Sequence, residues 1–308
     1  MKPAFLDTDR TRMPFETLRA LPVHFAAILS FAALIVCSGT PDRAAAADGY
    51  SAGDAYVPPT REIGNPITDR LALRISYTQA TAHTTLRIDP TGVPNGGTTF
   101  SGERDLGLAS TNPDGRVELM LRMGARDRMR VDYLQLDRTG DALLTHPVVF
   151  GNETFLANEE AVSSLNWKAM GFTYTHAFLQ TRNFEAGAGL GVHLISFDAI
   201  GSVPATFQTH ETSEAGAFPT IALDAMWRIS SRFAFTGRGQ YLGDTLHTFS
   251  GSLGDYHGDF QYRWRSPFAI GIGYSYMRAS FQSVGHAGSP GRFVMSLAGP
   301  ELFVRVSF

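Results

Sequence analysis

The residues that could carry acid–base chemistry are few, and two of them stand close together at Asp255 and His257. A carboxylate beside an imidazole can orient a general base that activates water. A catalytic site of this kind would also need a pair of acidic residues in a corresponding position on other strands. The sequence has no such pair, so we expect Asp255 and His257 to lie in a solvated loop. His193 and Ser196 are too far apart for a His-x-Ser pair on one face of a strand. We therefore expect no catalytic residues and no enzyme.

The sequence also has no pattern that indicates a metal or cofactor site. The 9 His are scattered without ligand spacing, and the one cysteine is Cys37. The glycine row at Gly187, Gly189 and Gly191 is followed by no helix, so it is not a phosphate loop. A net charge of −3 gives no basic excess for nucleic acid. We expect no metal, no cofactor and no nucleic-acid partner.

The remaining charged residues alternate with apolar ones, which points to strands that position them. At the end of the chain Val304, Val306 and Phe308 recur every second residue, with Arg305 and Ser307 between them. A period of two places one set on each face of a strand. Most of the chain after residue 70 repeats this pattern.

The repeated pattern predicts an all-β fold, a closed antiparallel transmembrane β-barrel of about ten strands, with eight or twelve as alternatives. Lipid offers the backbone no hydrogen-bond partner, so a sheet in a membrane must close on itself. Short turns near 126, 181, 231 and 266 alternate with long polar loops at 90–115, 138–163, 198–217, 243–256 and 282–291. Thr98–Leu108 is expected as an additional β-segment over the mouth. A mean hydropathy of −0.07 excludes a bundle of membrane helices.

The charged set then faces the lumen of the barrel, with Arg in excess and no Lys. Its members are Arg74, Glu118, Arg122, Arg130, Asp132, Glu185, Asp224, Arg228, Arg238, Arg263 and Arg305, accompanied by His193, Gln240 and Gln261. A barrel of this size is filled by its own side chains, and buried charges must pair. We interpret the set as a salt-bridged plug. The alternative is a narrow path that prefers anions.

The first part of the chain predicts export and a lead-in. A basic region, the apolar run Phe25–Cys37 and the small residues up to Ala46 and Ala47 are typical of a signal peptide, 1–47, cleaved near Ala46 or Ala47. The start is Met1 or Met13. Residues 48–69 read as a flexible periplasmic lead-in, and 70–308 as the barrel. Val304, Val306 and Phe308 would be the terminal signal read by the barrel-assembly machinery.

Four segments carry a resemblance to known proteins: Gly97–Thr99, Asp105–Leu108, Leu136–Gly140 and Phe150–Phe155. Together they resemble a group of uncharacterised outer-membrane β-barrel proteins of Gram-negative bacteria. Members usually have two acidic residues before Leu-Gly-Leu, and here Arg104 replaces one. The resemblance implies a barrel and an outer-membrane location and transfers no activity.

These observations predict a monomeric outer-membrane barrel in contact with lipid, with a structural or narrow-pore role and a largely plugged lumen. A surface binding or adhesion module acting through the loops is the second hypothesis. A hydrolase at the rim, using Asp255 and His257, is the third.

Overall fold

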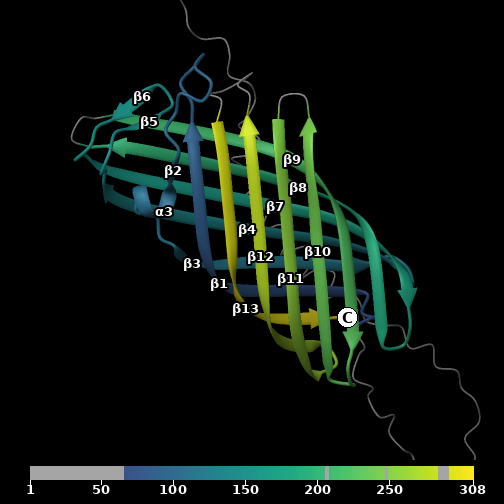
Figure 1. Ribbon diagram of the computed structural model, residues 1–308. Helices are drawn as coiled ribbons and strands as arrows, with labels where there is room; N and C mark the ends of the chain where they lie inside the picture. Colours follow the sequence, from purple (N-terminus) through teal and green to yellow (C-terminus); the bar gives the residue numbers. More distant parts are fainter. Residues whose placement is uncertain (1–65, 205–207, 247–248, 284–290) are drawn as a thin grey trace, which may run out of the picture. The chain divides into compact units, whose positions relative to one another are not determined.

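The computed structural model describes residues 66–204, 208–246, 249–283 and 291–308. The signal peptide, its cleavage site and the part of the lead-in before residue 66 lie outside these residues. Ten long strands make up most of the described chain (Figure 1): β1 (Leu71–Ile88), β3 (Thr111–Arg122), β4 (Asp127–Leu143), β7 (Glu160–Gln180), β8 (Phe184–Val203), β9 (Gln208–Arg228), β10 (Phe233–Leu246), β11 (Phe249–Arg265), β12 (Phe268–Ser283) and β13 (Gly291–Ser307). No helix of the described part is long and apolar enough to cross a membrane.

The ten strands close into an antiparallel barrel, as predicted. Each pairs with its neighbour in the chain, and β13 returns to pair with β1 from Ala72↔Ser307 to Ile88↔Gly291. The short turns also lie where they were expected, since β7 and β8, β9 and β10, and β11 and β12 are joined by two to four residues. The start of the first strand and the end of the last strand therefore both lie on the short-turn side of the barrel.

The half of the barrel nearest the short turns carries apolar side chains on its outer face, and we call this half the belt. Ile75, Leu190, Ile272 and Leu302 point outward and keep 52%, 68%, 65% and 57% of their surface exposed. Such a surface suits lipid, and in most strands it spans the roughly 9–11 residues that a tilted transmembrane strand needs. Two rings of aromatic residues bound this belt. One ring includes Trp227, Trp264 and Phe308, and the other includes Tyr77, Tyr133 and Tyr274.

The outer ring marks the level at which the outward residues become polar. Tyr77 donates a hydrogen bond to Gln79 Oε1 at 3.1 Å, and Tyr133 donates to Gln135 Oε1 at 2.9 Å. In both strands the phenol lies on the apolar side and the amide two residues further out. An amphipathic side chain with its polar tip held in this direction is typical of a membrane–water interface.

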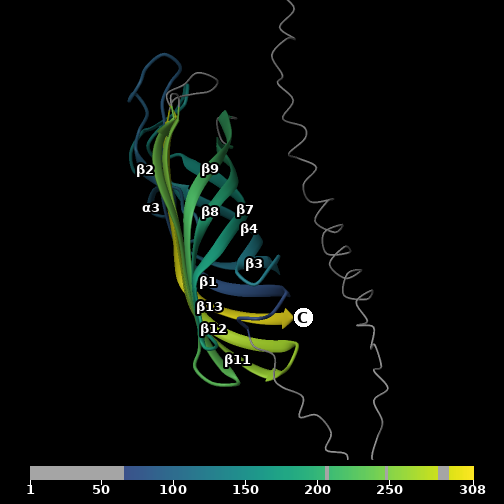
Figure 2. The same ribbon diagram turned by 90° about the vertical axis from the view of Figure 1, so that its right-hand side faces the viewer.

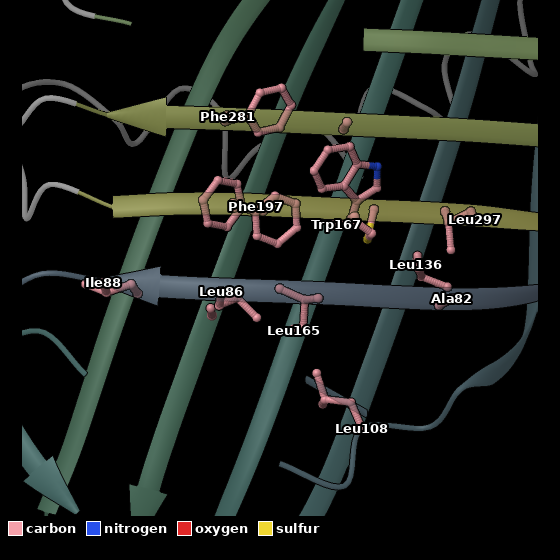
Figure 3. Packing of buried hydrophobic residues seen from close by; sticks show 14 of the residues in the cluster. Ala82, Leu86, Ile88, Leu108, Leu136, Leu165, Trp167, Phe197, Phe281 and Leu297 are labelled. Atoms are coloured by element: carbon pink, nitrogen blue, oxygen red, sulfur yellow. The ribbon is translucent and has the colours of Figure 1, made fainter. Parts of the chain in front are cut away.

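Beyond this level the strands continue and their pattern is reversed. Polar residues such as Thr81, Thr85 and Lys168 point outward, and apolar ones fill the inside. Trp167 of β7 is fully buried and stacks on Phe281 of β12 and Phe293 of β13, with ring centroids 5.9 and 5.6 Å apart. The two walls of the barrel thus touch through their side chains, and Figure 3 shows the two layers crossing with this cluster between them. The outer half is a β-sandwich rather than an open cylinder.

A cap of short elements closes the outer end: β2 (Phe100–Ser101), α3 (Gly102–Asp105), β5 (Val148–Phe150) and β6 (Glu153–Phe155). β2 pairs with β1, so the segment expected at Thr98–Leu108 is only partly a strand. Phe150 packs on Phe100 and Phe155, with centroids 5.6 and 6.5 Å apart. Figure 1 labels all four elements on its upper left side, and Figure 2 shows β2 and α3 from a second direction.

The cap also brings together the segments that carry the family resemblance. Gly107 has φ +67°, and a Cβ there would lie 2.2 Å from the Asp141 carbonyl oxygen. A Cβ on Gly140 would lie 2.4 Å from Gly107 itself, so the two segments require glycine at their crossing. The Thr98 N–H donates to the Val149 carbonyl oxygen at 3.0 Å, which joins the segment Gly97–Thr99 to the residue just before Phe150–Phe155.

The predicted loop boundaries are wrong in one consistent way. Residues 198–217 and 243–256 were expected as long polar loops, but their described parts, except Pro204, belong to β8, β9, β10 and β11. β4, β7, β12 and β13 also extend into the other predicted loops. Strands whose outer face meets water carry polar residues on that face. These polar residues were interpreted as parts of loops.

Candidate functional site

The charged residues predicted to face the lumen do point inward, and most of them are buried. Arg74, Glu118, Arg122, Arg130, Asp132, Glu185, Asp224, Arg263 and Arg305 lie on the inner face of the belt, as do His193, Gln240 and Gln261. Glu185 is fully buried, and Arg74 keeps 6% of its surface exposed. Arg228 and Arg238 are half-buried on the same face. Since alternation decides which face a residue takes, these positions could be read from the sequence.

Pairing begins at the short-turn end with a residue from the lead-in. Asp69 is buried and accepts hydrogen bonds from Arg263, with Nη1 at 3.0 Å, and from Arg305 at 3.4 Å. The end of the predicted flexible segment is therefore fixed inside the barrel. Asp69 was missed because it precedes the first alternating strand.

The next level holds one carboxylate between two guanidinium groups. Glu185 contacts Arg122 at 3.0 Å and Arg128 at 2.9 Å, and Arg128 also contacts Asp224 at 2.8 Å. A carboxylate that is completely removed from water requires such partners, because an unpaired buried charge is strongly destabilising. Arg228 is the exception, with no ion pair to any residue that the structure describes.

The middle of the belt holds two further groups. Glu118 pairs with Arg130 at 3.3 Å and with Arg238. Arg74 reaches Asp259 at 2.8 Å and Glu301 at 2.9 Å, and its guanidinium carbon lies 3.7 Å from the ring centre of Phe303. The ring face and two carboxylates occupy most of its bonding directions.

Asp255 and His257 lie at the outer edge of this network, so the expectation of a solvated loop is wrong. Both are buried on the inner face of β11, with 3% and 6% of their surface exposed. Arg116 Nη1 lies 2.8 Å from Asp255 and 2.7 Å from His257 Nε2, and His257 Nδ1 lies 3.3 Å from Glu301. Every one of these atoms faces another side chain of the network.

A polar collar and then the aromatic cluster lie above the charges. Gln240 Oε1 accepts hydrogen bonds from Thr173 at 3.2 Å and Thr220 at 3.0 Å, and lies 3.0 Å from His193 Nε2. The stacked rings around Trp167 follow. Along the barrel axis the interior thus passes from paired charges to neutral hydrogen bonds to hydrocarbon.

The cap is fastened by one buried arginine. Arg138 is fully buried and donates to Glu103 Oε1 and to Thr84 Oγ1, each at 2.7 Å, and to the Ala109 carbonyl oxygen. Burial alone would raise the pKa of Glu103, but hydrogen bonds from the Thr84 N–H and from Arg138 hold that pKa below its ordinary value. The pair links the cap to β1 and β4.

Two further observations concern metal binding and the terminal residues. Among residues 66–204, 208–246, 249–283 and 291–308, no group of three His, Cys, Asp or Glu side chains is placed to hold a metal ion. Val304 and Val306 face outward on β13, and Phe308 follows the end of this strand with 54% of its surface exposed.

Comparison with known proteins gives structural likeness alone. No family model and no curated protein matches the chain. Three of the solved structures that match are the outer-membrane protease OmpT of Escherichia coli, the attachment invasion locus protein Ail of Yersinia pestis bound to the heparin analogue sucrose octasulfate, and a FadL homologue of Pseudomonas aeruginosa. The matched structures are outer-membrane β-barrels. The expected resemblance to that class is confirmed.

The three likenesses are of similar extent. OmpT is 11% identical with a TM-score of 0.48, over 78% of this chain and 97% of OmpT. Ail is 9% identical with a TM-score of 0.33, over 76% and 98% of the two chains. The FadL homologue is 8% identical with a TM-score of 0.36, over 78% and 91%. Identities and TM-scores this low transfer no activity, substrate or partner.

Proposed function

We propose that the protein is a closed, non-conducting barrel of the outer membrane, in which the belt anchors a rigid β-sandwich outside the lipid. The observation that carries this proposal is the burial of the inward side chains. Arg74, Glu185 and Glu301 keep only 6%, 0% and 3% of their surface exposed. A water-filled channel would expose the residues that line it, so this burial supports a filled lumen.

The outer half supports the same conclusion independently. The aromatic cluster joins β7 and β8 to β12 and β13, with Phe197 and Phe293 centroids 4.5 Å apart. An ion that passed the charged level would meet hydrocarbon and then the cap. The anion-preferring path would need both levels to open.

Single-channel recording in planar bilayers tests the proposal. We expect no stable conductance steps from the wild-type protein, and none after Arg138→Ala loosens the cap, because both filled levels remain. Stable steps from the wild type with anion preference would overturn the closed barrel in favour of the narrow pore. A wide open porin of known conductance, inserted in the same bilayers, shows that insertion is being detected.

A second function, surface binding, is favoured by the exposed apolar residues beyond the belt. Leu143 and Leu156 keep 62% and 57% of their surface exposed where lipid does not cover them. Exposed leucines near a cap are candidates for a protein contact. Cells that display the protein should adhere to a host-cell layer better than cells that display Leu143→Ser with Leu156→Ser. Equal adherence of both strains would contradict this role. The matched control is Leu190→Ser, which changes an outward-facing leucine of the belt.

A further inference from the structure

The pairing of β1 with β13 is interrupted at one level of the barrel wall. Between β1 and β13 the register runs from Thr78↔Glu301 to Thr81↔Ala298, and the two pairs between them are missing. Pro300 stands in this gap, exposed on the outer face of β13. A proline inside a closed sheet is unusual, because it cannot donate to the ladder.

The register shows which hydrogen bond is lost. At the strand ends the Phe308 N–H donates to the Leu71 carbonyl oxygen at 2.8 Å, and the Leu71 N–H donates back at 3.1 Å. Such reciprocal pairs recur every second residue in an antiparallel ladder, which places residue 300 opposite Gln79. Since proline has no N–H, the Gln79 carbonyl oxygen receives no ladder bond there. The residue before Pro300 lies against this carbonyl group, since a Cβ added to Gly299 would lie 2.2 Å from the Gln79 oxygen.

A groove of about 620 Å³ lies on the outer face at this point. Its walls include Tyr77, Phe260, Tyr274 and Leu302, which keep 51% to 57% of their surface exposed. Between these large side chains stand Pro300 and Gly258. A Cβ added to Gly258 would meet nothing within 4 Å, so the missing side chain leaves open space in the groove.

The position of the groove decides what it can hold. It opens in the lipid-facing belt and extends up to the level at which Tyr77 donates to Gln79, since both of these residues line it. It is therefore continuous with the surface that meets acyl chains, in the leaflet away from the short turns. Its volume is within the roughly 300–1,000 Å³ of small-molecule sites. Four residues beyond Tyr274, the exposed Arg278 points outward on the polar side of the interface.

We propose that this groove holds one acyl chain of a membrane lipid as a bound lipid. The phosphate of its headgroup lies at the level of Arg278. The aromatic side chains of the groove and Leu302 surround the acyl chain, and the small residue Gly258 and Pro300 form the floor of the groove. A guanidinium at headgroup height suits a phosphate, since it offers paired N–H donors. The inference requires only that the belt lies in lipid, so it stands or falls separately from the closed lumen.

Native mass spectrometry of the purified barrel in detergent, with a synthetic phosphatidylglycerol added, tests this proposal. We expect one lipid per wild-type barrel to survive at collision energies that strip the others. Gly258→Leu should abolish that species by filling the groove. Gly115→Leu is the matched control, because Gly115 also faces outward with nothing within 4 Å and does not line the groove. Arg278→Gln should lower retention several-fold while leaving the barrel folded.

Each result has a definite consequence. Retention by the wild type and Gly115→Leu but not by Gly258→Leu supports the site. Absence of a retained lipid on the wild type overturns it, and so does equal retention by the wild type and Gly258→Leu. Migration of unheated samples on gels shows whether each variant has folded, and Gly258→Ala, a smaller change at the same position, should retain the lipid.

Discussion

The two halves of this barrel use the same strands with opposite patterns. In β1, Ile75 faces outward and Arg74 inward within the belt, whereas further along Thr85 faces outward and Leu86 inward. The strand does not change its alternation between these points. Only the medium outside changes, from lipid to water, and the apolar residues move from the outer face to the inner one. The side that is apolar therefore identifies the surrounding medium.

The largest effect should come from removing the side chain that joins the walls of the outer half. Trp167→Ala leaves a cavity among Phe197, Phe281 and Phe293, and should lower the free energy of unfolding by about 3–5 kcal/mol. Urea unfolding from lipid vesicles, followed by fluorescence of the remaining tryptophans, measures it. The neighbour Lys168→Ala, which faces water, should stay within about 0.5 kcal/mol. Similar losses for both would mean that the outer half has no packed core.

A second experiment places the same charge on the outer face of each half. Ile75→Arg puts a guanidinium against lipid and should cost about 2–4 kcal/mol of folding free energy near the middle of the bilayer. Thr85→Arg puts it in water and should change that free energy by no more than about 0.5 kcal/mol. Refolding yield into vesicles and the urea midpoint give both values. If Thr85→Arg proved as costly as Ile75→Arg, the boundary between the halves would be misplaced.

The smallest effect concerns the cap, where an ion pair lies outside the lipid. The pKa of Glu103 is held below its ordinary value, so its contribution is complete above the unfolded carboxyl pKa and is lost as the pH falls through the folded value. Hydrogen exchange in residues 100–110, corrected for its intrinsic rate, should therefore quicken in acid relative to β3. Glu103→Gln should exchange quickly at every pH and lose this dependence. A wild-type cap that is insensitive to acid would remove Glu103 as its fastening.

The sequence could predict the belt well because lipid outside and charges inside leave a clear alternation. Arg74, Glu118 and Glu185 were placed on the inner face for that reason, and the count of ten strands followed. The partners could not be predicted, because Arg74 and Asp259 stand 185 residues apart and meet only through the closed barrel. Arg116, Asp255, His257 and Glu301 were missed or misplaced where Gly115, Gly258 and Pro300 interrupt the outward apolar row.

The outer half was harder to predict for a related reason. Its strands carry polar residues outward and rings inward, as in a water-soluble sandwich, and no single residue marks where the change begins. Tyr77 with Gln79 and Tyr133 with Gln135 do mark it, through the same spacing in two strands. That repeated Tyr-x-Gln spacing was the available signal.

Asp69 has a consequence for the order in which the barrel forms. It stands just before the first strand, yet its partners Arg263 and Arg305 belong to β11 and to the last strand. During synthesis the carboxylate must wait for almost the entire chain before either guanidinium exists. Sealing of the seam therefore completes the pairing of this carboxylate as a late event, and a chain that lacks its final strand would lose Arg305 and keep Arg263 as the partner of Asp69.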